Sequence, residues 1–141
     1  MKEEQQKDLQ QKYMQLQMLQ QQIKQLQQQI QQFEQQIADL TSLSSSLDDL
    51  KKLKPGSDTL VPISSGIFAK ASLKDNEELL VNVGANTIVK KSIPDTKKLI
   101  DKQSSEVRKL QEQLLGQLQK AAVEAESAEK ELQSLVGESK E

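Results

Sequence analysis

The stretch QLQMLQQQIKQLQQQIQQFEQQIADL, residues 15–40, decides the fold of this chain. It is either a disordered glutamine tract or a helix with an apolar seam. Apolar residues in and around it recur in two interleaved series, each with an interval of seven, which is typical of the a and d positions of a heptad repeat. Disordered polar tracts carry no such period, and glutamine is a good helix former. The first series is Leu9, Leu16, Ile23, Ile30 and Ile37, and the second is Leu19, Leu26, Phe33, Leu40 and Leu47.

These series predict a long coiled-coil helix over residues 3–53 rather than an aggregation-prone glutamine tract. The seam is expected to change phase near Ser44, a polar residue at an a position, with Leu43, Leu47 and Leu50 continuing the apolar stripe. Such a stutter locally unwinds a coiled coil. The dipeptide Pro55-Gly56 then ends the helix.

Residues 57–93 have a different pattern, in which four short apolar segments are separated by turn signals. We predict strands at residues 60–63, 67–74, 79–83 and 87–93, which form two consecutive hairpins. Pro62 restricts the first strand to an edge. Four short strands bury too little surface to be stable alone, and their open edges pair readily with other chains. The pattern therefore predicts an oligomer that assembles through the hairpins.

A second helix is expected to begin between Ser92 and Asp95, since Pro94 suits a first turn, and to end at Gly137. Its stripe has one irregular step near Leu114. The economical arrangement is an antiparallel coiled coil of the two helices, with both chain ends at one tip. The expected stripe is Val107, Leu110, Leu114, Leu118, Ala121, Ala125, Ala128, Leu132 and Leu135.

Composition argues against an enzyme. The chain of 141 residues contains no cysteine and no histidine, so it lacks the usual nucleophile–base pairs and the best transition-metal ligands. We expect no catalytic, cofactor-binding or metal-binding residues. A net charge of -2 does not suggest nucleic-acid binding, and no apolar run is long enough to span a membrane. The N-terminal sequence does not read as a signal peptide, and we expect a cytoplasmic protein.

The hairpin block DTLVPISSGIFAKASLKDNEELLVNVGAN, residues 58–86, resembles the prefoldin family. The match is carried by Leu60-Val61-Pro62, by Gly66 and by Val81-Asn82-Val83-Gly84, and the resemblance covers nearly the whole chain. Two hairpins, rather than one, resemble the archaeal type of α subunit. Asn86 departs from a common glycine but tolerates a positive φ. One prefoldin domain is thus expected, with helical segments at 1–54 and 94–141 around an assembly region at 55–93.

The resemblance implies an α+β, mostly α, fold and a hexamer of two α and four β subunits with a central β-barrel body. Its coiled-coil tips would hold non-native polypeptides and deliver them to a group II chaperonin, without ATP or another cofactor. The main alternative is a static coiled-coil scaffold or tether that assembles through its hairpins.

Two sets of residues are candidates for these roles. Apolar residues near the predicted tips are candidates for client binding, because exposed methionine suits promiscuous contact. The alternatives are that the leucines among them simply complete the coiled coil, which the seam pattern favours, and that the methionines are ordinary surface residues. Apolar hairpin residues are candidates for subunit assembly. The first set is Leu9, Tyr13, Met14, Leu16, Met18, Leu132, Leu135 and Val136. The second set is Leu60, Val61, Ile63, Ile67, Phe68, Leu79, Val81, Val83, Ile88 and Val89.

Overall fold

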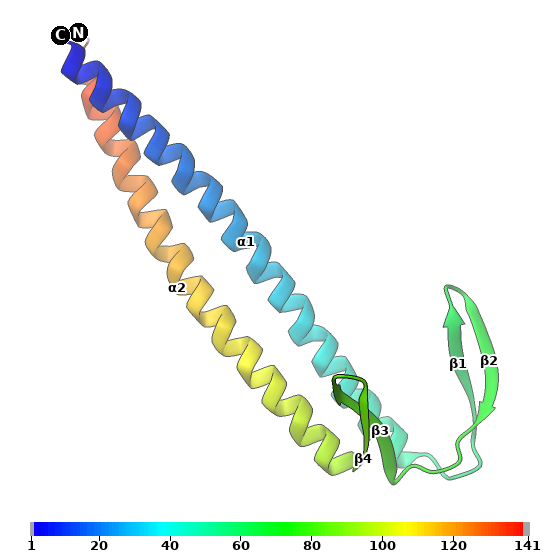
Figure 1. The fold of residues 1–141 in the computed structure, drawn as a ribbon. Helices are drawn as coiled ribbons and strands as arrows, with labels where there is room; N and C mark the ends of the chain where they lie inside the picture. The colour runs from blue at the N-terminus through cyan, green and yellow to red at the C-terminus, as the bar shows by residue number, and fades with distance from the viewer. Residues whose placement is uncertain (1, 140–141) are drawn as a thin grey trace. The chain divides into compact units, whose positions relative to one another are not determined.

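The computed structural model describes residues 2–139 and consists of two long helices separated along the chain by two β-hairpins (Figure 1). This confirms the predicted fold class. The chain divides into two compact units, one comprising Met1–Gln36 with Val107–Glu141 and the other comprising Ile37–Glu106. The elements in chain order are α1 (Glu3–Lys52), β1 (Asp58–Ser64), β2 (Ile67–Ser72), β3 (Glu78–Gly84), β4 (Thr87–Ser92) and α2 (Ile93–Ser139).

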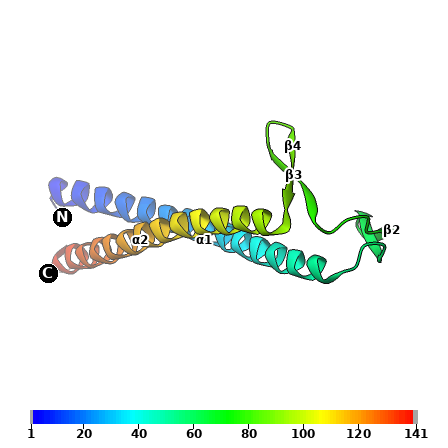
Figure 2. The same cartoon turned by 90° about the horizontal axis from the view of Figure 1, so that it is seen from below.

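In the first unit, α1 and α2 lie side by side and run antiparallel (Figure 1, Figure 2). An ion pair between Lys12 Nζ and Glu131 Oε2, 2.9 Å apart, links the start of α1 to the end of α2. The buried side chains are leucines from α1 and alanines from α2, so a large residue on one helix is matched by a small one on the other. These buried residues are Leu19, Leu26, Ala121 and Ala128.

The seam keeps its heptad register further than expected, which corrects two predictions. On α1, Ser44 is half-buried in the seam while Leu43 is exposed, so the stripe does not shift before Leu47. On α2, Gln111 is half-buried and Leu110 is 47% exposed, so the expected irregular step near Leu114 is absent. The register continues because many regularly spaced seam residues fix it along a rigid helix. A single leucine one position away from the seam does not outweigh them.

The core of the second unit is a small apolar cluster at the base of the helices. Leu47 of α1 packs with Ile93 and Ile100 of α2, and Ile93 is only 2% exposed. Leu79 of β3 packs against the same cluster, as do Leu40 and Leu50. The second hairpin is therefore attached to the helices through its own side chains. The expected stripe on α2 began at Val107 and missed this cluster.

The two hairpins are separate two-stranded antiparallel sheets, β1 with β2 and β3 with β4. This confirms the predicted pair of hairpins, although β2 ends at Ser72 rather than at residue 74. In each hairpin the pairing register shifts just before the turn. Gly84 and Asn86 have positive φ as expected, and Ala85 has φ 49° as well. Successive residues at positive φ produce the tight turns that match strand twist.

The helix ends are closed by side chains. Ser92 caps α2, because its Oγ accepts a hydrogen bond from the Asp95 N–H at 3.2 Å. The end of α2 was predicted wrongly, since the helix continues through Gly137 to Ser139. Gly137 does not have positive φ, so it does not form the left-handed cap that ends many helices.

Candidate functional site

The first hairpin exposes apolar side chains on both of its faces. Val61 of β1 pairs with Ala69 of β2, and Pro62 pairs with Phe68, so these two pairs lie on opposite faces. Every residue of β1 is exposed, and Phe68 is exposed as well. A two-stranded sheet with both faces open to solvent has no internal core, which is typical of an element that is covered in an assembly. The exposed large apolar residues of this hairpin are Leu60, Val61, Ile63, Ile67 and Phe68.

The second hairpin has one covered face and one open face. Leu79, Val81 and Val89 are half-buried, and Leu79 contacts the helical core. On the other face, Leu80 is 73% exposed and Ile88 is also exposed. Val83, near the turn, is exposed too. Leu80 was not among the residues assigned to assembly, although its position next to Leu79 in an alternating strand could have indicated it.

At the distal end, defined as residues 3–18 of α1 and 132–137 of α2, the candidate residues fall into two groups. Leu9 and Leu16 are half-buried in the seam of α1. On α2, Leu132, Leu135 and Val136 are half-buried too. Tyr13, Met14 and Met18 are instead exposed on α1, Met14 by 62% and Met18 by 70%. The client-binding hypothesis therefore applies most directly to the second group, since those side chains are open to solvent.

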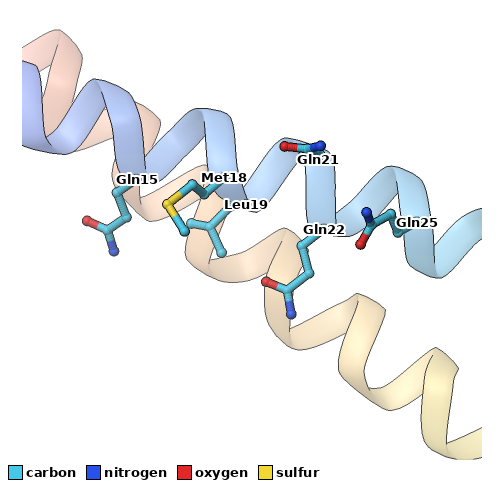
Figure 3. A pocket seen from close by; sticks show the side chains of 6 residues that line it. All are labelled: Gln15, Met18, Leu19, Gln21, Gln22 and Gln25. Carbon is cyan, nitrogen blue, oxygen red and sulfur yellow. The ribbon is translucent and has the colours of Figure 1, made fainter.

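A shallow groove of about 420 Å³ lies on α1 beside Met18 (Figure 3). Its apolar part is formed by Met18 and Leu19, whose side chains lie next to each other. Glutamine amides complete the lining, which contains no charged residue. Each amide can both donate and accept hydrogen bonds. The glutamines are Gln15, Gln21, Gln22 and Gln25.

Among residues 2–139, no three or more acidic, histidine or cysteine side chains are grouped so that they could hold a metal ion. Within the same described range, neither helix is long and apolar enough to cross a membrane.

The pKa of Asp48 is lowered, chiefly because the Lys97 ammonium donates a hydrogen bond to its carboxylate. That pair joins α1 to α2 at the surface.

The family model for prefoldin subunits matches residues 19–138. The chain belongs to the prefoldin family. Prefoldin is a family of non-enzymatic chaperones, so the chain is a chaperone-type subunit and not an enzyme. The fold is similar to that of a solved prefoldin, the filamentous PFD of Methanocaldococcus jannaschii seen by cryo-electron microscopy, with a TM-score of 0.73. That match has 21% sequence identity and covers 79% of this chain and 93% of the other. Among curated proteins, none matches this sequence.

Large exposed apolar side chains occur in both compact units. The exposed apolar residues of the hairpins and those at the distal end are separate groups, one in each of the two compact units.

Proposed function

We propose that the chain is the α subunit of a cytoplasmic holdase that binds non-native polypeptides at its distal end without ATP. The observation that carries this proposal is the exposure of Tyr13, Met14 and Met18, which lie outside the seam near the start of α1. Methionine is flexible and polarizable, so it adapts to varied client side chains. Each partly covered side chain contributes about 1 kcal/mol or less. Several tips that engage one client would raise its affinity through effective concentration, while each weak contact allows release.

We further propose that the hairpins assemble this chain with a second α copy and four β subunits into a hexamer with a β-barrel body. The open faces of both hairpins support this, since Phe68 is 57% exposed and Leu80 is 73% exposed within the subunit. The structural neighbour from Methanocaldococcus jannaschii is itself an assembled, filamentous prefoldin. The proposed complex delivers its clients to a group II chaperonin.

The experiment is the aggregation of a denatured model protein diluted into the purified complex of this chain with a β-type partner, without nucleotide. We expect aggregation to be suppressed. Deletion of residues 1–18 together with residues 132–141 should reduce suppression while the native mass of the hexamer is kept. A complex that forms but does not suppress aggregation would overturn the holdase proposal. A deletion that dissolves the hexamer would contradict the proposed division between tip and body.

A matched pair of variants sharpens this test. The first replaces three exposed distal residues by serine, and the second replaces three comparably exposed leucines elsewhere on the helices. Both variants remove exposed apolar surface, but only the first removes it from the distal end. Only the first should therefore weaken suppression of aggregation. The distal variant is Tyr13→Ser, Met14→Ser and Met18→Ser, and the control variant is Leu43→Ser, Leu110→Ser and Leu115→Ser.

A static scaffold is the second candidate, and one observation favours it. Leu9, Leu16, Leu132 and Leu135 are half-buried, as expected if they complete the coiled coil. A scaffold would assemble through its hairpins but would not bind non-native chains. Delivery distinguishes the two further, because only a holdase increases the yield of client folded by a group II chaperonin.

A further inference from the structure

We infer that the thioethers of Met14 and Met18 form an oxidation site for peroxides, and that their oxidation weakens client binding at the distal end. Methionine side chains are usually buried, yet these two are 62% and 70% exposed. They are four residues apart on α1, so they share one face of the helix, off the seam formed by Leu16 and Leu19. Figure 3 shows the sulfur of Met18 beside the side chain of Leu19, among the residues that line the glutamine-rich groove.

The sequence confines oxidation chemistry to very few groups. The chain has no cysteine, no histidine and no tryptophan, and three methionines in all, the third being Met1. The ordinary thiol route to redox sensitivity is therefore absent from this chain. Two-electron oxidants act on exposed thioethers. Met14 and Met18 are thus the described positions at which a peroxide can convert an apolar contact surface into a polar one.

The reaction needs only the peroxide. A sulfur lone pair attacks one peroxide oxygen, an S–O bond forms and the O–O bond breaks. The departing hydroxide takes the proton of the transferred oxygen and leaves as water. The thioether is oxidised by two electrons to a sulfoxide, and the peroxide is reduced by two electrons. A sulfoxide is polar and a strong hydrogen-bond acceptor, so it loses the adaptable apolar contact that the thioether offers.

The position of the two residues predicts a change in binding without unfolding. The seam at this level is formed by Leu16, Leu19 and their neighbours on α2, and the two thioethers are not part of it. Oxidation therefore leaves the coiled coil intact. This effect on clients rests on the proposed holdase function, whereas the reactivity of the two sulfurs does not.

The test uses the assembled complex with its β-type partner, treated with hydrogen peroxide. Peptide mass spectrometry should show that Met14 and Met18 each gain one oxygen atom. The concentration of complex needed to half-suppress aggregation should rise about 3- to 10-fold, in keeping with two weakened side-chain contacts. The far-ultraviolet circular dichroism should stay unchanged. Reduction by methionine sulfoxide reductases with a dithiol should restore the original concentration.

The matched control is the double variant Met14→Leu with Met18→Leu, which keeps apolar side chains, keeps Met1 and uses the same β partner. Its own half-suppressing concentration should not change when peroxide is added. Equal loss in both complexes, or no loss after full oxidation, overturns the inference about clients. If the sulfurs of Met14 and Met18 stay unoxidised, the proposed oxidation site is wrong. If the untreated complex does not suppress aggregation, both the proposed holdase function and the predicted effect on clients are wrong. The peptide masses still show whether Met14 and Met18 are oxidised.

Discussion

The side chain of Asn76 donates a hydrogen bond from Nδ2 to the backbone carbonyl of Leu53 at 2.6 Å, across 23 residues of sequence. The same nitrogen lies 3.3 Å from the carbonyl oxygen of Lys51. These carbonyls belong to the end of α1, where the last carbonyl groups of a helix have no partner within the helix. The segment between the two hairpins thus closes the end of α1. The Gly56 N–H donates a hydrogen bond to the Leu73 carbonyl at 2.6 Å, and the Leu73 N–H donates one to the Ser57 carbonyl at 2.8 Å. These bonds hold the first hairpin at the same place.

Replacing Asn76 by alanine should lower the free energy of unfolding by about 1 kcal/mol, because the carbonyls of Lys51 and Leu53 lose their side-chain donor. Thermal or denaturant unfolding at one fixed protein concentration measures this. Asn76→Asp keeps the size of the side chain but removes the donor, so it should be at least as destabilising. If Asn76→Asp unfolds like the unchanged protein, the hydrogen bond does not stabilise the helix end.

The ion pair between Asp48 and Lys97 should make stability depend on pH in the acid range. Lys97 donates a hydrogen bond that lowers the pKa of Asp48 below its ordinary value of 3.8, and the charges of Lys97, Lys52 and Lys51 act in the same direction. A carboxylate with a lowered folded-state pKa contributes stability above its unfolded pKa, and this contribution disappears as the pH falls through the folded pKa.

The melting temperature of the unchanged protein should therefore exceed that of Asp48→Asn near neutral pH, and the two should converge once the pH has fallen through the lowered pKa of Asp48. Because the pair lies at the surface, added salt should reduce the difference. Asp49→Asn, which removes an equal charge one position along, is the control and should have a smaller effect. A difference between the unchanged protein and Asp48→Asn that persists in strong acid would contradict this assignment.

The sequence predicted the helices and hairpins well, because each depends on a local signal. Heptad spacing, Pro55-Gly56 and the turn residues of the hairpins act over a few positions, and the elements that they predicted are present. The predicted seam was wrong at positions where the local sequence does not determine which residue faces the partner helix. Leucine at 43 and 110 looked like the better core residue, but register is set by the whole stripe and by the partner helix, so Ser44 and Gln111 occupy the seam.

Gln111→Leu should raise the free energy of unfolding by about 1 kcal/mol, since it places an apolar side chain in a half-buried seam position. The counterpart Leu110→Gln should change stability by less than about 0.5 kcal/mol, because Leu110 is exposed. Denaturant unfolding of both variants decides the register. If the larger effect belongs to Leu110→Gln, as a loss of stability, then the irregular step near Leu114 exists after all.

The candidate residues could be predicted as groups but not as individual orientations. Tyr13, Met14 and Met18 belong to neither of the two predicted seam series, and they are exposed. In the hairpins, alternation alone does not say which face meets the helices. That depends on the contact between Leu79 and the cluster around Ile93, which lies fourteen residues further along the chain.

Adjacent residues 79 and 80 should therefore respond to mutation in opposite ways. Leu79→Ala should lower the stability of the unassembled chain by about 2 kcal/mol, because its side chain packs on the core of its own subunit. Leu80→Asp should leave that stability nearly unchanged but prevent assembly with a β-type partner, since a charge would enter the proposed interface. Unfolding of the separate chain and native mass of the mixed subunits measure the two effects. Leu80→Asp subunits that assemble normally would show that the open face of the second hairpin is not an interface, even if the first hairpin is.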